Sequence, residues 1–377
     1  MGLHSARSRA FVVAGAIAIA ASVGTASAKS TSSASAHSSA GFSAAIAANK
    51  GYETRPTSIG ITTPVGAKIP KGKTIDFIQC GVPACVVEGN ILAAATKLLD
   101  WKLVRINAGT SAQQIADAYQ TAVTNKPNAV IGSGFDRSLF ASEIVKLKAM
   151  KIPVLEAFVA DSTGNGIYVV GGPKLNAIQG KEEADYILAS TTSKSASFGS
   201  VVPSGFANMV QENTAFQKEI KAQCSGCSVK PLIVPVTSIG TDLPTRVSTF
   251  LTANPKILWT WLGYDDMVSG VPVALKGAGI TSAKFSTISM NGTVADAIKG
   301  GQDVYSGIGV SFPEVYWREI DLLARDFAGK SYSVDLNDAT LPVWTITKSN
   351  LPSDAGATLF ANVVTYQQQF KKLWGLG

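Results

Sequence analysis

A repeated alternation of short apolar strands and amphipathic helices begins at Lys73 and constrains the fold of this chain more than any other feature. The segment 74–79 is a short apolar run, and apolar residues then recur at helical spacing between Val87 and Leu98. The pattern predicts strands at 74–79, 102–106, 128–133, 152–158, 167–172, 198–202, 229–235, 257–262, 285–289 and 303–308. It predicts intervening helices at 87–98, 111–123, 137–150, 175–190, 211–223, 243–253, 266–278, 293–299 and 314–328.

Strands that alternate with helices predict parallel sheets with helices on both faces. About ten strands over about 280 residues suit two such sheets better than one. The 377 residues are enough for two core-forming domains. We therefore predict an α/β protein with two doubly wound parallel-sheet domains.

The N-terminus has the pattern of a secretory signal peptide over residues 1–28. Arg7 and Arg9 precede an apolar run at 11–21, and small residues at 26–28 match a cleavage site. The apolar run is short for a membrane span. Residues 29–72 are rich in Ser and Ala and then in Pro, which predicts a flexible or extended N-terminal tether. No cysteine lies near the predicted cleavage site, so a lipid anchor is not supported. We therefore expect the protein to be located in the periplasm, in the extracellular medium or at the cell surface.

Charge and histidine content exclude several functional classes. The chain has 33 basic and 26 acidic residues, and removal of the signal leaves a net charge of +5 without a dense basic run. Nucleic-acid binding is therefore unsupported. The two histidines, His4 and His37, lie in the signal and the tether. The folded part therefore contains no Ser-His-Asp triad, no Cys-His pair and no His-ligated zinc site. We expect that the protein is not an enzyme and binds no metal or cofactor.

Candidate site residues follow the strands, because doubly wound sheets bind ligands at the carboxyl ends of their strands. In the first half they are Cys80, Gly81, Ala84, Ser133, Phe135, Asp136 and Phe158. In the second half they are Phe206, Asn208, Gln211, Glu212, Thr237, Ser238, Tyr264, Asp265, Met290, Asn291, Ser311 and Phe312. Aromatic and hydrogen-bonding groups suit a small polar ligand with apolar faces. The set lacks the Lys or Arg that would hold a phosphate or carboxylate.

The stretch ILWTWLGYDDMVSG (257–270) admits two interpretations. Asp265 and Asp266 suit the cap and first turn of a helix. Tyr264, and with it Asp265, also lies where a ligand contact is expected. Trp259 and Trp261 share one strand face, and core packing is favoured over ligand stacking. A metal site is disfavoured because no second carboxylate pair lies nearby in the sequence.

The four cysteines form two close pairs, CGVPAC (Cys80 and Cys85) and CSGC (Cys224 and Cys227). In an exported chain this spacing favours two structural disulfides. A thiol-redox centre at Cys224 and Cys227 is the alternative, although the pair follows a helix and precedes a strand. The Cys80–Cys85 bond would rigidify a loop of the cleft.

The order of these segments resembles the substrate-binding proteins of ABC transporters, of the ribose- and galactose-binding type. The resemblance covers about 73–348, and its carrying stretches include KTIDFIQCGVPACVVEGNILAAATKL, AVIGSGFDRSLFASEIVKLKAMKIPVLE and TFLTANPKILWTWLGYDDMVSGVPVALKGAG. YVVGGPKLNAIQGKEEADYIL, SMNGTVADAIKGG and YSGIGVSFPEVYW complete the set. The family implies two similar α/β domains joined by three crossover segments, with the ligand in the cleft.

The resemblance places the crossovers near 170–172, 311–312 and 341–343. It assigns 73–171 and 312–341 to an N-terminal subdomain, and 172–311 and 342–377 to a C-terminal one. A helix pattern within 359–374 is expected to pack on the second domain.

Family binding positions fall on Cys80, on Ala84 and Cys85, on Ser133 or Asp136, on Gln211 or Glu212, and on Tyr264, Asn291 and Ser311. Phe158 and Val159 replace the family's sugar-gripping Asp-Arg pair. The expected pocket is therefore more neutral and more aromatic than an ordinary sugar site.

These observations predict an exported solute-binding protein that works as a monomer. It would capture a small neutral ligand, either sugar-like or more apolar and aromatic, and deliver it to an ABC permease by hinge closure. A ligand sensor for a membrane receptor and an exported thiol oxidoreductase are the alternatives.

Overall fold

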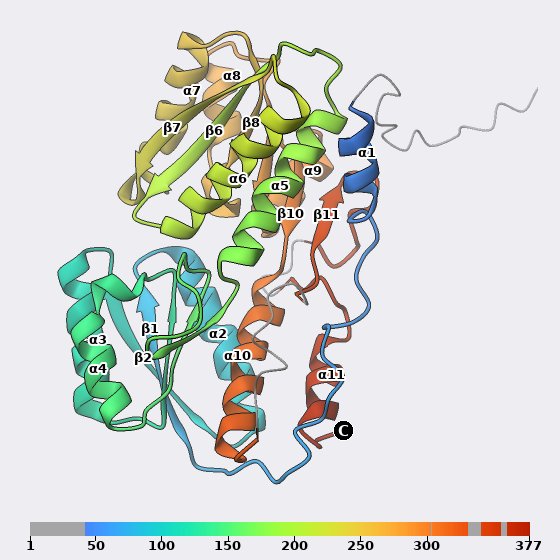
Figure 1. Ribbon diagram of the computed structural model, residues 1–377. Coiled ribbons are helices and arrows are strands. Elements are labelled where there is room, and N and C mark those ends of the chain that lie inside the picture. The colour runs from blue at the N-terminus through green and yellow to red at the C-terminus, as the bar shows by residue number, and fades with distance from the viewer. Residues whose placement is uncertain (1–41, 303, 331–340, 356–359) are drawn as a thin grey trace, which may run out of the picture. The chain divides into compact units, whose positions relative to one another are not determined.

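The computed structural model describes residues 42–302, 304–330, 341–355 and 360–377, and shows two α/β domains (Figure 1). The first is built on a five-stranded sheet with the order β2-β1-β3-β4-β5, and the second on a six-stranded sheet with the order β7-β6-β8-β9-β10-β11. The first five strands of each sheet therefore follow the same order. All strand pairs are parallel except β10 with β11. The predicted fold class is confirmed.

Helices cover both faces of the first sheet. Its strands are β1 (Thr74–Cys80), β2 (Lys102–Gly109), β3 (Ala129–Ser133), β4 (Val154–Ala157) and β5 (Ile167–Val170). One core contains side chains of α2 (Pro83–Leu98), α10 (Phe312–Phe327) and α11 (Tyr366–Leu373), and the other contains side chains of α3 (Ala112–Asn125) and α4 (Ala141–Ala149). A short 3-10 turn, η1 (Arg137–Leu139), precedes α4.

The second sheet is covered in the same way. Its strands are β6 (Ser197–Ser204), β7 (Ser228–Pro235), β8 (Ile257–Leu262), β9 (Lys284–Ile288), β10 (Val304–Gly309) and β11 (Trp344–Thr347). One core contains side chains of α7 (Leu243–Ala253), α8 (Val271–Gly277) and α9 (Gly292–Gly300), and the other contains side chains of α1 (Ser43–Lys50), α5 (Pro173–Ala189) and α6 (Ala207–Gln223). The 3-10 turns η2 (Val236–Ser238) and η3 (Asp265–Val268) follow β7 and β8.

Local sequence signals explain several of these elements. Ser111 begins α3 with a capping box, in which its hydroxyl accepts from the Gln114 amide. Trp259 and Trp261 are buried in one core of the second domain, which confirms the packing role predicted for them. The helix predicted at 266–278 is instead divided into η3 and α8, because Gly270 adopts a left-handed conformation between them.

The two predicted disulfides are present. Cys80–Cys85 joins the end of β1 to the first turn of α2, and Cys224–Cys227 joins the end of α6 to the start of β7. Each bond spans a strand–helix junction, where it fixes the direction in which the chain leaves one element for the next.

The C-terminal helix corrects one prediction. Trp317 of α10 stacks on Trp374, just after α11, with ring centroids 5.4 Å apart, and α11 contributes to a core of the first domain rather than the second. Figure 1 shows α10 and α11 side by side. Phe360 still packs with β11, whereas Ala361 lies in the first domain's core, so the chain returns there after β11. The other predicted domain boundaries and crossovers stay a prediction.

The N-terminal tether corrects a second prediction, because residues 43–50 of its segment predicted as flexible form α1, and Ala45 is buried in a core of the second domain. The N-terminal strap, residues 51–73, follows this helix. Its Ile59, Ile61 and Val65 side chains are buried in a core of the first domain, so this part of the predicted tether is extended but firmly packed. The Arg55 guanidinium forms a two-armed ion pair with Asp354 at 2.8 Å. The predicted signal peptide and residues 29–41 of the tether lie outside the described residues. Among the helices of the described part, none has the length and apolarity to cross a membrane.

Candidate functional site

Strands from both sheets end at one pocket, which we call the aromatic pocket. Its walls come from the carboxyl ends of β1, β3, β4, β6, β8 and β9 and from helices α2, α5, α6 and α10. Its volume is about 70 Å³. The lining residues are Cys80, Val82, Ala84, Cys85, Glu88, Ser133, Gly134, Phe158, Gln179, Phe206, Asn208, Met209, Glu212, Gly263, Tyr264, Ile288, Ser289 and Phe312. This is where doubly wound sheets bind ligands.

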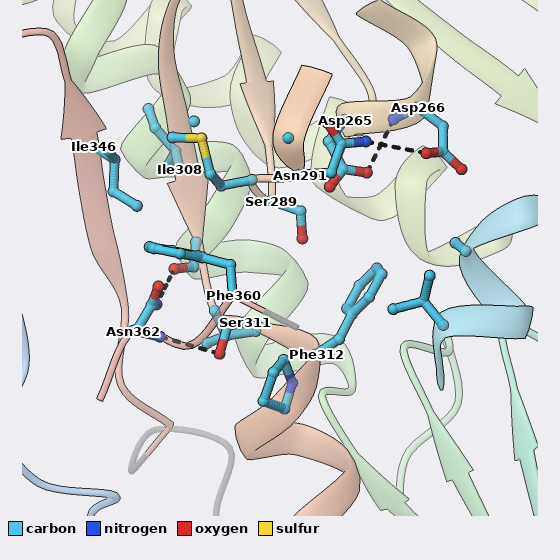
Figure 2. A pocket seen from close by; sticks show the side chains of 18 of the residues that line it. Asp265, Asp266, Ser289, Asn291, Ile308, Ser311, Phe312, Ile346, Phe360 and Asn362 are labelled. Atoms are coloured by element: carbon cyan, nitrogen blue, oxygen red, sulfur yellow. Dashed lines mark hydrogen bonds between the residues drawn. The ribbon is translucent and has the colours of Figure 1, made fainter. Parts of the chain in front are cut away.

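A second cavity of about 280 Å³, the crossover pocket, adjoins the first and shares Ala84, Ser289 and Phe312 with it. It reaches from η3 and the start of α9 to β10, β11 and Asn362 (Figure 2). The shared residues place the two cavities side by side.

The structure distributes the predicted ligand residues over three locations. The aromatic pocket contains Cys80, Ala84, Ser133, Phe158, Phe206, Asn208, Glu212, Tyr264 and Phe312. The crossover pocket contains Asp265, Met290, Asn291 and Ser311, and again Ala84 and Phe312. Six predicted residues line neither cavity: Gly81, Phe135, Asp136, Gln211, Thr237 and Ser238.

Thr237 and Ser238 lie in η2, and the other four residues have other structural roles. The Gly81 amide donates to the Gly109 carbonyl, and Phe135 packs edge-on against Tyr119 in a core of the first domain. Asp136 immediately precedes η1, with its side chain away from both cavities. Gln211 donates to the Ala160 carbonyl, so this residue of α6 in the second domain bridges to the loop after β4 in the first domain.

Glu88 and Gln179 of the aromatic pocket were missed because they lie inside helices rather than after strands. Glu88 follows Ala84 and precedes Ile91 and Ala95 on the buried face of α2, at helical spacing. An acid within an apolar stripe is unusual and was the signal available in the sequence. Gln179, on the buried face of α5, gives a weaker signal of the same kind.

Aromatic rings form one side of the aromatic pocket. Phe158 packs edge-on against Phe312 at 5.4 Å and against Tyr316 at 6.1 Å between ring centroids. Phe158 and Ser289 both have left-handed backbone conformations, with φ of 53° and 68°. Such strain, on the order of 1–3 kcal/mol per residue, is often found at ligand sites. The Phe158 ring therefore extends from a backbone position that is itself constrained.

Two carboxyl groups, those of Glu88 and Glu212, also line the aromatic pocket, and burial raises the pKa of both. Burial raises the pKa of Glu88 to about 7, although hydrogen bonds with Tyr316 and Ser133 act in the opposite direction. The Ser133 and Tyr316 hydroxyls are themselves 2.7 Å apart. Burial also raises the pKa of Glu212 well above its usual range, against the effect of a hydrogen bond from Asn208.

The acidic pair after β8 serves the structure around η3. The Asp266 amide donates to Asp265 Oδ1 at 2.9 Å, and Asn291 Nδ2 donates to Asp266 Oδ1 at 3.1 Å (Figure 2). Asn291 also caps α9 by accepting from the Val294 amide. Neither aspartate side chain caps η3, which corrects the capping interpretation, whereas both do lie in its first turn. Burial raises the pKa of both carboxyls.

Comparison with known proteins identifies the fold. No family model and no curated protein matches the chain. Among solved structures, a glucose-galactose binding protein from Geobacillus stearothermophilus has a TM-score of 0.65 at 15% identity, covering 75% of this chain and 100% of that one. An ABC transporter solute-binding protein from Agrobacterium vitis, bound with α-D-tagatopyranose, has a TM-score of 0.64 at 16% identity, covering 77% and 99%.

A periplasmic ribose ABC transporter protein from Conexibacter woesei has a TM-score of 0.61 at 19% identity, and the match covers 76% of this chain and 95% of that one. At these identities the similarity concerns the fold. The chain has the fold of the sugar-binding proteins of ABC transporters, which confirms the resemblance read from its sequence.

Proposed function

We propose that this chain is an exported solute-binding protein that captures a small ligand in the aromatic pocket and delivers it to an ABC importer. The observation that carries the proposal is the position of this pocket. The carboxyl ends of strands from both sheets line it, together with aromatic rings and buried polar groups. Such a combination fixes the orientation of a small ligand while its apolar faces are covered.

The structural relatives support the same function. They are a glucose-galactose binding protein, a tagatopyranose-bound solute-binding protein and a periplasmic ribose transporter protein. A ligand that contacts both domains would favour their approach, because it adds contacts available only when both walls are close. An ABC permease is therefore the proposed partner, and the signal pattern at residues 1–28 supports export.

Thermal unfolding of the chain that starts at Lys29 tests the proposal. The ligand pools would contain pentoses, hexoses, disaccharides, polyols, amino acids and amines, and aromatic compounds. A ligand present at 100 times its dissociation constant stabilises the protein by about 2.7 kcal/mol, which raises the melting temperature by a few degrees. We expect such a shift with at least one pool, and no shift with any pool would contradict the proposal.

Two phenylalanine variants would locate the binding. Phe158→Leu removes a ring from the aromatic pocket, and we expect it to weaken binding by about tenfold through lost ring contacts. Phe135→Leu is the control, because Phe135 follows a strand of the same sheet but lines neither cavity. Equal weakening by both variants would argue against this pocket as the binding site.

A further inference from the structure

Unsatisfied polar atoms in the aromatic pocket indicate the chemistry of its ligand. Five buried side-chain oxygens that line it make no hydrogen bond within the described part of the chain: Glu88 Oε2, Gln179 Oε1, Asn208 Oδ1, Glu212 Oε2 and Tyr264 Oη. Each residue has at most 5% of its surface exposed, so water reaches these atoms poorly. Buried polar atoms without partners are costly, and a bound ligand can supply the missing partners.

The unsatisfied atoms are almost all acceptors. An amide oxygen and an ionised carboxylate oxygen only accept, and among the five oxygens only the Tyr264 hydroxyl also donates when both acids are ionised. A sugar hydroxyl donates one hydrogen bond but also needs donors for its own lone pairs. An ammonium group has three donors and no acceptor. A ligand group that only donates therefore matches this pocket better than a hydroxyl does.

The charges around the pocket have one sign. None of the described residues that line either cavity is Lys, Arg or His. Further carboxyl groups lie near these residues. Asp265 and Asp266 of η3 raise the pKa of Tyr264, and Glu183 of α5 raises that of Glu212. Glu88 in turn raises the pKa of Glu319 on α10. Aromatic ring faces also attract a desolvated cation, and Phe158, Phe206, Tyr264 and Phe312 supply four rings to the same walls.

We propose that the aromatic pocket binds a small organic cation, a primary ammonium compound with a polyol or aromatic body. The ammonium group would donate to Glu88, Glu212 and the neighbouring amide oxygens, and the rings would cover the apolar body. This inference rests on the proposed function, because it names the ligand class of the same site. It excludes phosphate- or carboxylate-bearing ligands, since no cationic side chain lines either cavity in the described part of the chain.

Binding of such a cation should release protons. Burial raises the pKa of Glu88 to about 7 and also raises that of Glu212, so the empty pocket retains protons at mildly acid pH that exposed carboxyls would have lost. A bound ammonium group favours the ionised carboxylates and expels a proton. The affinity for the amine should therefore rise by up to about tenfold per pH unit between pH 5 and 7. The affinity for a neutral ligand should lack this slope.

The test uses two pairs of probes that differ only in one group. They are 1-amino-1-deoxysorbitol with sorbitol, and 2-phenylethylamine with 2-phenylethanol, titrated calorimetrically into the chain from Lys29 at pH 5, 6 and 7. We expect the amine of at least one pair to bind ten times or more tighter than its alcohol, and its affinity to increase with pH. Ca²⁺ is titrated as a further probe.

Carboxamide variants assign the effect to residues. Glu88→Gln and Glu212→Gln should each reduce amine affinity by about 10- to 100-fold, while the alcohols are unaffected. Glu314→Gln is the matched control, because Glu314 is equally buried but lines neither cavity. The wild-type comparison of amine with alcohol stands even if a variant does not fold.

The outcomes separate this inference from the proposed function. Binding of neutral sugars or alcohols with no preference for the amine would overturn the inference and leave the solute-binding function in place. Binding of Ca²⁺ without the amines would overturn the assignment of an organic ligand. If neither these probes nor any of the ligand pools bound, both proposals would fall.

Discussion

Gly134 shows how a single residue keeps the aromatic pocket open. Its φ is +75°, and a Cβ atom placed there would lie 3.1 Å from the Phe206 ring. We expect Gly134→Ala to destabilise the fold by about 1 kcal/mol through backbone strain and, in addition, to displace Phe206 and weaken ligand binding several-fold. Denaturant unfolding and ligand titration measure the two effects separately.

Gly240→Ala is the control for strain alone. Gly240 has nearly the same φ, +76°, and open space where its Cβ would lie. We expect a similar loss of stability with unchanged ligand affinity. If both alanine variants bound ligand equally well, Phe206 would not be the ring that Gly134 accommodates.

At the scale of elements, the N-terminal strap should stabilise the first domain. The Ile59 side chain is fully buried. Its backbone amide donates a hydrogen bond to Gln369 Oε1 at 3.1 Å. We expect Ile59→Ala to lower the free energy of unfolding by about 2–5 kcal/mol. Ile233→Ala, at a side chain that is 55% exposed, should cost less than about 0.5 kcal/mol. Equal effects in denaturant unfolding would mean that the strap does not pack as described.

The elements themselves were largely predictable, because alternation and helical spacing are local properties of the sequence. The sequence did not specify which elements pack against one another. The amphipathic tail helix could have packed on either domain, and only the stacking of Trp374 on Trp317 decides between them. Similarly, strand-end residues such as Ser133 and Tyr264 could be predicted because parallel strands end at one edge. Glu88 was missed by this rule, since it reaches the pocket from the interior of a helix.

For the whole molecule, the buried acids predict stability that falls as pH rises. Burial raises the pKa of Glu88 to about 7, and that of Glu183 and Glu314 to about 8, from an ordinary value of 4.5. The folded chain therefore binds more protons than the unfolded chain between pH 4.5 and 8. This stabilisation is complete below pH 4.5 and is lost as pH rises through these folded-state values.

Guanidinium unfolding at pH 5, 6.5 and 8 measures this dependence. We expect the free energy of unfolding to decrease by several kcal/mol from pH 5 to pH 8, since each unit of pKa shift corresponds to about 1.4 kcal/mol. Glu183→Gln should flatten the dependence. Asp354, whose pKa the Arg55 guanidinium lowers, acts in the opposite direction only at lower pH. A stability that increased from pH 5 to pH 8 would contradict the account.

The central claim is that one ligand contacts strand ends of both sheets, and hydrogen–deuterium exchange with and without the bound ligand tests it most directly. We predict slower exchange in the ligand complex at 80–89 and 133–135 of the first domain and at 206–213 and 263–268 of the second. Unchanged exchange on one of the two sides, or protection confined to a surface away from the aromatic pocket, would contradict a solute site formed by both sheets.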